Sequence, residues 1–207
     1  MFKKKPLIVF EGVEGSGKSL HINNVAKFLK KKNIKFIKIR EPGGSKNSEK
    51  IRKIILNKKS NFNQKTDLLL YLASRSENIE KIIKKNYKKK IILIDRFIDS
   101  TLAYQHYGMG INKSIINRLN NYLLGKIKID FTFLNLVNMI NLKLRLSKRQ
   151  NLNRYDNFKI SFYKKIQNGF IKISKRNKKK YLLINSNDSI NKNKKIILNK
   201  TNKLLGL

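Results

Sequence analysis

The sequence predicts an α/β fold in which a five-stranded parallel sheet lies between two layers of helices. Short apolar runs alternate along the chain with longer segments whose apolar residues recur at helical spacing. The apolar runs contain few polar positions, as expected for parallel strands that are buried on both faces. The 207-residue chain has no internal repeat and no proline- or glycine-rich linker, so it predicts a single domain over residues 1–207.

The first predicted strand, residues 7–10, leads into a glycine-rich loop and a helix over residues 20–32. The loop reads Gly-x-x-x-x-Gly-Lys-Ser, the pattern of a phosphate-binding P-loop. Such glycines let backbone N–H groups approach phosphate oxygens, and the helix directs the positive end of its dipole toward them. A chance glycine-rich turn is the alternative, but the strand, the spacing and the helix all favour a P-loop. The predicted nucleotide-binding residues are Gly12, Val13, Glu14, Gly15, Ser16, Gly17, Lys18 and Ser19.

A second strand is predicted over residues 35–39, followed by the loop Arg-Glu-Pro-Gly-Gly at residues 40–44. Proline and paired glycines mark a turn at the C-terminal end of that strand. Ligands of open α/β sheets bind at this edge. Either Asn47 or Ser48 is predicted to cap the next helix, which runs to Asn57.

A long helix is predicted over residues 64–86. Tyr71 and Arg75 lie four residues apart in it, so their side chains share one face of the helix. Taken alone, Tyr71 is best explained by packing in the core and Arg75 by an ion pair at the surface.

The next predicted strand ends in an acidic residue. Residues 91–94 are apolar and Asp95 follows, which resembles a Walker B strand whose carboxylate holds Mg²⁺ near the Ser19 hydroxyl. The pattern is weak alone but gains weight from the P-loop in the same domain. Arg96 stands at the same strand end, where its charge suits a second phosphate group. A helix is predicted to begin near Ser100.

The remaining segments complete the alternation and contain a basic, polar stretch. The predicted elements are a helix over 113–124 that ends at Gly125, a strand over 131–136, helices over 139–146 and 158–173, a strand over 181–184 and a final helix from Ser189. Between the two middle helices, residues 145–156 carry Arg145, Arg149 and Arg154. The stretch is either a solvated loop or a lid that brings an arginine over the transferring phosphate. The complete prediction is a P-loop NTPase-like three-layer sandwich with a small lid.

Composition sets limits on partners and location. The formal net charge is +37, which would ordinarily indicate a nucleic-acid partner. The lysines are spread over the whole chain, and no zinc finger, RNP-like motif or separate basic tail is present, so solvated lysine surfaces are the better interpretation. The chain has no cysteine and no apolar run long enough to cross a membrane. We therefore expect a cytoplasmic protein with neither a membrane nor a specific nucleic-acid partner.

Four strings of residues, in this order, resemble the thymidylate kinases of the bacterial type. They are Glu-Gly-Val-Glu-Gly-Ser-Gly-Lys-Ser at 11–19, Arg-Glu-Pro-Gly-Gly at 40–44, Tyr71 with Arg75, and Asp-Arg-Phe-Ile-Asp-Ser-Thr-Leu-Ala-Tyr-Gln at 95–105. The second and fourth strings are specific to this family among P-loop kinases. The resemblance extends from Leu7 to the last helix.

The resemblance implies that the protein phosphorylates dTMP to dTDP with Mg²⁺ and ATP, in dTTP biosynthesis, and that it forms a homodimer. Lys18 would neutralise phosphate charge, and Mg²⁺ would lie near Ser19 and Asp95. The implied substrate-binding roles fall to nine residues: Arg40 and Arg96 at the dTMP phosphate, Tyr71 stacked on thymine, Arg75 at thymine O4, Thr101 and Gln105 near the base, Glu14 at the 3′-hydroxyl, Ser100 beside the substrate, and Tyr104 against a 2′-hydroxyl.

The resemblance leaves the catalytic lid arginine open. No arginine stands between Gly12 and Gly17, so the lid would supply it, with Arg149 as first choice and Arg145 and Arg154 behind it. Several positions depart from the family pattern: Leu20, Phe97, Asn135, Asn138 and Asn153.

Three interpretations follow from the sequence. The favoured one is dTMP kinase, the second is another P-loop nucleotide or nucleoside kinase, and the third is a basic nucleic-acid-binding protein with a vestigial P-loop. Intact Lys18, Ser19 and Asp95 argue against the third.

Overall fold

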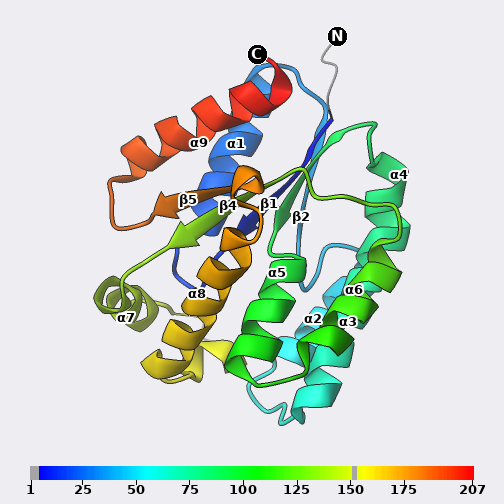
Figure 1. Ribbon diagram of the computed structural model, residues 1–207, viewed down its shortest axis with the longest axis vertical. Helices are drawn as coiled ribbons and strands as arrows, with labels where there is room; N and C mark the ends of the chain where they lie inside the picture. The colour runs from blue at the N-terminus through cyan, green and yellow to red at the C-terminus, as the bar shows by residue number, and fades with distance from the viewer. Residues whose placement is uncertain (1–4, 151–152) are drawn as a thin grey trace.

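The computed structural model describes residues 5–150 and 153–207, and it contains a sheet of five parallel strands in the order β2-β3-β1-β4-β5 (Figure 1). The strands are β1 (Leu7–Glu11), β2 (Phe36–Arg40), β3 (Ile91–Asp95), β4 (Phe131–Leu136) and β5 (Tyr181–Asn185). The three central strands are buried almost throughout, because helices cover both faces of the sheet. The predicted five-stranded α/β fold is confirmed.

Helices connect the strands and form the two outer layers. Their bounds are α1 (Lys18–Lys31), α2 (Lys46–Leu56), α3 (Gln64–Asn78), η1 (Ile79–Ile83), α4 (Lys84–Asn86), α5 (Ile98–Thr101), η2 (Leu102–Gly108), α6 (Lys113–Leu124), α7 (Met139–Ser147), η3 (Arg154–Asn157), α8 (Ile160–Lys175), η4 (Lys178–Lys180) and α9 (Ile190–Leu205). Both η1 and η2 are π-helical, and η3 and η4 are 3₁₀ turns.

The hydrophobic core is divided between the two faces of the sheet. Side chains alternate along each strand, so Ile8 and Phe10 of β1 point to the face covered by α1 and α9, where the rings of Phe10 and Phe133 stack with centroids 5.0 Å apart. Leu7 and Val9 point to the opposite face and pack with residues of η1, while α8 and η2 pack against each other on that side. Burial on both faces holds the C-terminal ends of β1 and β3 in fixed register.

Most predicted element boundaries agree with the structure within a few residues, and one predicted cap is wrong. The helix after β2 begins at Lys46, and its N-cap is Ser45, whose side chain accepts a hydrogen bond from the Ser48 backbone N–H at 3.2 Å. Neither Asn47 nor Ser48 caps it. Gly125 does terminate α6 with a positive φ of 53°, as predicted.

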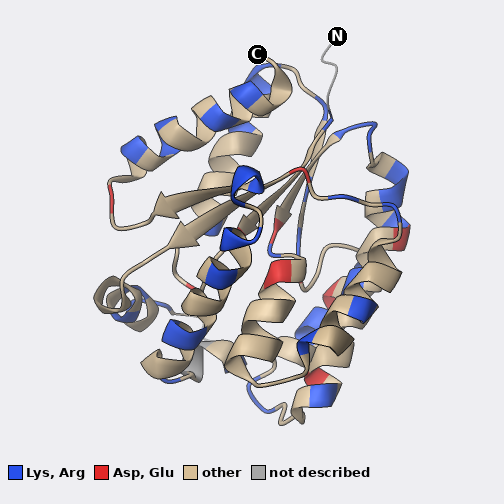
Figure 2. Cartoon of the chain, in the orientation of Figure 1, with Lys and Arg blue, Asp and Glu red and all other residues tan. Residues whose placement is uncertain are grey.

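The positive side chains are distributed over the outer helices of both layers. Figure 2 shows lysine and arginine along α8 and α9, with the acidic residues few and scattered. This distribution agrees with solvated lysine surfaces. Within residues 5–150 and 153–207, no helix combines the length and the apolar character needed to cross a membrane.

Candidate active site

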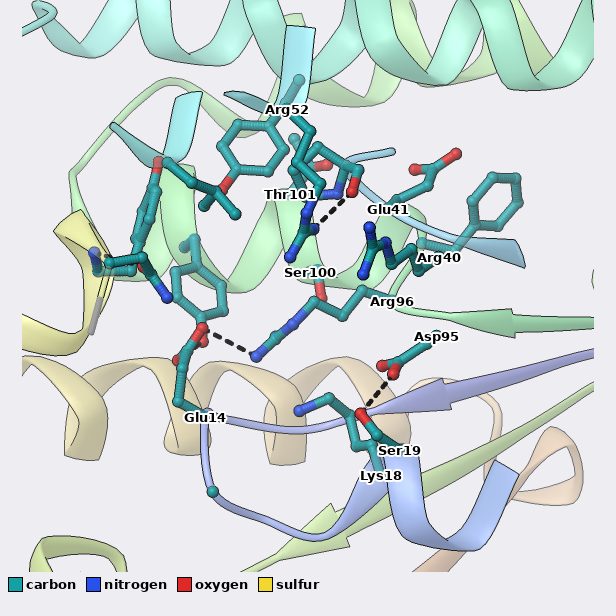
Figure 3. Close-up of a pocket in the computed structure, with 18 of the residues that line it drawn as sticks. Glu14, Lys18, Ser19, Arg40, Glu41, Arg52, Asp95, Arg96, Ser100 and Thr101 are labelled. Carbon is teal, nitrogen blue, oxygen red and sulfur yellow. Dashed lines mark hydrogen bonds and ion pairs between the residues drawn. The ribbon is translucent and has the colours of Figure 1, made fainter. Parts of the chain in front are cut away.

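The candidate site is a cavity of about 420 Å³ at the C-terminal edge of the sheet. Because β1 and β3 are paired with Phe10 opposite Asp95, the loops that follow these two strands lie side by side. The cavity also receives residues from the loop after β2, from α2, α3, α5, η2 and the stretch before α8. Figure 3 shows Lys18, Arg96 and Arg52 converging on it from three different elements. It therefore lies where ligands of doubly wound sheets bind.

The P-loop adopts a conformation that its glycines make possible. Gly12 has φ of 138°, and a Cβ built on it would lie only 2.3 Å from the backbone oxygen of Asn135 on β4. Gly17 has φ of 84° and forms the N-cap of α1 without a side-chain cap. The backbone N–H groups at the start of α1 thus have no side-chain acceptor from the cap and are suited to phosphate oxygens.

Lys18 lies at the base of this loop and is almost fully buried. Its ammonium donates to the Val13 carbonyl at 2.7 Å and contacts Ser16 Oγ at 3.4 Å. Burial, together with the positive charge of Arg96, lowers the pKa of Lys18 to about 8. A phosphate group beside Lys18 would restore its preference for the charged form.

Ser19 and Asp95 are the predicted Mg²⁺ ligands, and the fold brings them together. Ser19 Oγ donates to Asp95 Oδ2 at 2.7 Å across the end of the sheet (Figure 3). A hydroxyl and a carboxylate are the hard oxygen donors that Mg²⁺ prefers, and Mg²⁺ commonly takes few protein ligands beside phosphates and water. The pair therefore fits a Mg²⁺ ion bound to a nucleotide.

Arg96 is held by groups from the P-loop and from η2. Its φ of 67° is unusual for a residue with a side chain, and such strain concentrates at functional sites. The guanidinium donates to the Gly12 carbonyl at 2.8 Å and to Glu14 Oε1 at 2.9 Å, and it lies 5.3 Å from the centroid of the Tyr104 ring. Burial alone would raise the pKa of Glu14, but the charges of Arg96 and Lys18 lower it, so Glu14 stays ionised.

Glu11 is a buried carboxylate that the sequence prediction did not single out. It accepts hydrogen bonds from the backbone of Phe97 at 2.8 Å and from the Ser100 hydroxyl at 2.5 Å. Desolvation raises its pKa despite these donors. Glu11 therefore organises the turn after β3 that carries Arg96 and Ser100. Its signals in the sequence are an acidic residue at the end of an apolar strand and its place at the start of the family-like string at 11–19.

Arg75 is fully buried, so the ion pair expected for it lies in the interior rather than at the surface. It donates to Glu41 Oε2 at 2.8 Å, to Asn120 Oδ1 at 2.6 Å and to the Phe97 carbonyl at 3.0 Å. A guanidinium has five N–H donors. These contacts use three of the five, and Arg75 is also among the described residues that line the cavity.

Two polar side chains that line the cavity have atoms without a protein partner among the described residues. Thr101 is 2% exposed and Gln105 is 1% exposed, yet Thr101 Oγ1 and Gln105 Nε2 have no hydrogen-bond partner among the described residues. Each unpaired buried group costs about 1–3 kcal/mol, so a ligand that pairs with them gains this energy. Tyr71 and Tyr104 also line the cavity. Tyr104 and Gln105 belong to the π-helix η2, a form common at functional sites.

Besides Arg96, two arginines from β2 and α2 line the cavity, and the prediction named one of them. Arg40 is largely exposed and pairs with Glu49 at 3.0 Å, whereas Arg52 of α2 donates to the Pro42 carbonyl at 2.6 Å beside the cavity. Arg52 was missed because it lies in a lysine-rich helix. Only 9 of the 49 basic residues in the sequence are arginines. An arginine within a lysine-rich helix is therefore unusual in this chain, and this could have indicated a functional role for Arg52.

The three candidate lid arginines occupy different places. Arg149 lines the cavity. Arg145 donates to the backbone oxygens of Gly15 at 3.0 Å and Ser186 at 2.6 Å, and Arg154 pairs with Asp67 of α3. Neither Arg145 nor Arg154 is among the described residues that line the cavity.

Residues 151 and 152 of the predicted lid lie outside the described residues. The neighbouring Tyr155, which the prediction did not name, also lines the cavity and lies against Tyr71 and Tyr104. The remaining positions that depart from the family pattern leave the predicted P-loop and Mg²⁺ residues in place. Ser100 lines the cavity as expected.

Comparisons with known proteins agree with this geometry. The family model of thymidylate kinase matches residues 10–197. The thymidylate kinase of Sulfurihydrogenibium sp. is 40% identical over 194 residues, covering 92% of this chain and 94% of that protein, and that of Kosmotoga olearia is 34% identical over 187 residues, covering 89% of each. The crystal structure of thymidylate kinase from Ehrlichia chaffeensis superposes with a TM-score of 0.77 at 32% identity, covering 95% of this chain and 97% of that one. The chain therefore belongs to the thymidylate kinase family.

Proposed function

We propose that this enzyme transfers the γ-phosphoryl group of ATP to dTMP, giving ADP and dTDP for dTTP synthesis. The observation that carries the proposal is that one cavity joins a P-loop to a compartment suited to a nucleobase. Lys18, Ser19 and Asp95 lie at one end, and unpaired Thr101 and Gln105 lie at the other. A donor phosphate and an acceptor nucleotide can thus be held in one site, which phosphoryl transfer requires.

The donor end neutralises charge and holds the phosphates in place. The backbone N–H groups of residues 12–19 surround the ATP phosphates, and the Lys18 ammonium turns from the Val13 carbonyl to a phosphate oxygen. Bound Mg²⁺, held by Ser19 and Asp95, supplies further neutralisation of the phosphate oxygens. Because phosphoryl transfer asks for little covalent chemistry from the protein, these contacts account for most of the catalysis on the donor side.

The acceptor end holds the dTMP phosphate in line with the γ-phosphorus. Arg96 and Arg52 border that position, with Arg40 at its outer side. One oxygen of the dTMP phosphate attacks the γ-phosphorus, the bond to the β–γ bridging oxygen breaks, and ADP leaves with that electron pair. Arg149 is the arginine that we assign to charge on the transferring group, because it lines the cavity.

The base and sugar contacts select the nucleotide. Thymine stacks on Tyr71, a contact worth about 0.5–1.5 kcal/mol beyond burial. Thr101, Gln105 and the two remaining donors of Arg75 meet the polar edge of thymine. Tyr104 donates its hydroxyl to Glu14, which leaves the Glu14 carboxylate beside the 3′-hydroxyl and the Tyr104 ring against a 2′-hydroxyl.

We propose that residues 1–207 act as one catalytic unit, with residues 145–156 as a lid, and that the unit forms a homodimer. Exposed apolar side chains support the dimer, since Leu69 of α3 is 58% exposed and Tyr122 of α6 is 83% exposed. These helices pack against each other at one side of the molecule (Figure 1). We place the enzyme in the cytoplasm, with no specific nucleic-acid partner, because its substrates are cytoplasmic metabolites.

The test is ADP release with Mg²⁺, ATP and each of dTMP, dUMP, dCMP, dGMP, AMP and thymidine in turn. We expect preference for dTMP, weaker use of dUMP and loss of turnover in Lys18→Ala. One missing methyl group in a pocket is worth only about 1–3 kcal/mol, so dUMP should remain a real substrate. Preference for another acceptor would keep the P-loop chemistry and discard the assignments of Tyr71, Thr101 and Gln105.

A further inference from the structure

Asp67 is a buried carboxylate of α3 that the proposed reaction does not use. It is 2% exposed and lies on the first turn of the helix, one turn before Tyr71. Its two oxygens are occupied by two consecutive residues from a distant part of the chain. Oδ1 accepts from Arg154 Nη2, and Oδ2 accepts from the Tyr155 hydroxyl at 2.5 Å.

The three side chains form a closed set of contacts. Arg154 Nη2 also donates to the Tyr155 hydroxyl at 3.1 Å. The Arg154 guanidinium lies 5.6 Å from the ring centroid of Phe62, which precedes α3, and 5.0 Å from that of Tyr155. The Arg154 guanidinium therefore contacts Asp67 and two aromatic rings, and Arg154 is not among the described residues that line the cavity.

Tyr155 belongs both to this set of contacts and to the wall of the cavity. Its ring is 2% exposed and meets the rings of Tyr71 and Tyr104 edge-on, each with centroids 6.0 Å apart. Its backbone is held as well, because the Tyr155 oxygen accepts from the Tyr163 hydroxyl at 2.5 Å. The residue that Asp67 holds thus contacts both rings assigned to thymine and deoxyribose.

The cost of burying the Asp67 carboxylate favours the observed positions of Arg154 and Tyr155. A buried carboxylate that loses its charged partner bears a large desolvation penalty. Among the described residues, Arg154 and Tyr155 supply the side-chain hydrogen bonds to Asp67, so moving these two residues away leaves the buried carboxylate without these donors. The reverse also holds, because without the charge at position 67 Arg154 loses its ion pair and the Tyr155 hydroxyl loses its acceptor, which leaves their ring contacts and the hydrogen bond from Tyr163.

We propose that Asp67 is a positioning residue that seats Arg154 and Tyr155 against the base pocket and thereby sets the affinity for dTMP. This rests on the proposed function. Arg154 is then a tether for the pocket wall and not the arginine that acts on the transferring phosphate, a role left to Arg149.

The first test is Asp67→Asn, which keeps the shape and removes the charge. The Kd for dTMP without ATP and the KM for dTMP should both rise about 10- to 100-fold, as expected for losing one charged hydrogen bond. The KM for ATP should stay within threefold, and kcat should fall by no more than threefold. Arg154→Ala should give the same pattern, and the double variant should be no worse than either single variant.

Two further variants separate positioning from simple loss of structure. Tyr155→Phe removes only the hydroxyl that reaches Asp67 Oδ2 and should weaken dTMP binding while the ring stays. Asp67→Glu keeps the charge and should recover part of the affinity. Glu80→Gln, which breaks the exposed ion pair with Lys84, is the matched control and should leave dTMP affinity unchanged.

Hydrogen exchange of residues 153–157 in the free enzyme provides a readout that does not depend on turnover. Asp67→Asn should speed exchange there and leave β1 and β3 protected. If wild type prefers another monophosphate, this readout still tests the tether while the proposed function fails. Unchanged dTMP affinity with unchanged exchange in Asp67→Asn would overturn the inference, and so would a large loss of kcat in Arg154→Ala alone.

Discussion

Single residues at the cavity show how burial changes the chemistry of ordinary side chains. Lys18 is desolvated among P-loop groups, and the pKa of its ammonium is lowered to about 8 from the 10.5 of a solvated lysine. Arg75 is surrounded by Glu41, Asn120 and the Phe97 carbonyl, so its charge is balanced before any substrate arrives. In the proposed function, these residues would hold a phosphate and a base without large rearrangement.

The lowered pKa of Lys18 predicts how ATP binding depends on pH. Phosphate binds the protonated ammonium, and the free enzyme loses that proton as the pH rises through about 8. The affinity for Mg·ATP should therefore be constant below pH 7 and fall by up to about tenfold per pH unit above 8. Titration calorimetry between pH 6.5 and 9.5 measures this. Lys18→Arg, which keeps its proton, should lack the inflection, and constant affinity of wild type up to pH 9.5 would contradict the prediction.

The cavity arginines should separate into two kinetic classes. Arg149→Ala should lower kcat by roughly 10³-fold or more with less than a tenfold change in KM for dTMP, as for other arginines that act on a transferring phosphoryl group. Arg52→Ala should mainly raise the KM for dTMP, because Arg52 lines the cavity and we assign it to the acceptor phosphate. Steady-state kinetics with varied dTMP distinguishes them. Normal turnover of Arg149→Ala would show that another arginine has this role.

At the scale of elements, caps and loops were predictable to the extent that their contacts are local. Gly125 ends α6 as expected, because a glycine after a helix adopts a positive φ without strain. The cap of α2 was misplaced because Ser45 and Ser48 both satisfy the local rule. Ser48 instead donates its hydroxyl to the Ser74 carbonyl of α3 at 2.5 Å, while the Ser45 N–H donates to Asn78 at 2.9 Å. Contacts between helices made the choice.

The junction between the P-loop and β4 should tolerate no side chain at Gly12. An alanine Cβ there would lie 2.3 Å from the Asn135 backbone oxygen, and φ is 138°. We expect Gly12→Ala to lower the free energy of unfolding by about 2–5 kcal/mol, from backbone strain and overlap together. Gly125→Ala is the matched control, since φ is also positive but nothing lies within 4 Å, and it should cost about 1–2 kcal/mol. Urea unfolding measures both, and equal costs would show that Asn135 can move away.

At the scale of the whole molecule, the large positive net charge affects the stability of the folded state. A formal net charge of +37 causes self-repulsion that weakens the compact state. The positive residues lie on outer helices of both layers, so screening acts on the entire surface (Figure 2). The same charge gives nonspecific attraction to polyanions at low salt.

Stability should therefore respond to salt and to nucleotide by separate routes. Raising NaCl from 20 to 300 mM should increase the Tm by several degrees through screening. ATP with Mg²⁺ at about 100 times its Kd should add about 2.7 kcal/mol by binding the folded state. Lys18→Ala should keep the salt response and lose most of the ATP response. A Tm that changes with neither the NaCl concentration nor added ATP would contradict this account.

The sequence by itself determined the sheet, the P-loop, the pairing of Ser19 with Asp95 and the family, because these depend on short patterns. A glycine pattern between a strand and a helix defines a backbone conformation locally, and Asp95 at the end of an apolar strand meets Ser19 in any sheet where β1 and β3 are neighbours. Phosphate chemistry could thus be predicted from residues that are close in the chain.

Only the tertiary structure decided which side chains share the remaining contacts. Arg52, Glu11 and Tyr155 reach the site or its supporting turn from three different elements, and Asp67 meets Arg154 across 87 positions of sequence. Such pairings depend on how helices pack over the sheet, and packing is set by the volumes of many buried side chains together. A sequence pattern does not specify the distances between helices. It could therefore identify several candidate lid arginines but not which side chain each of them contacts.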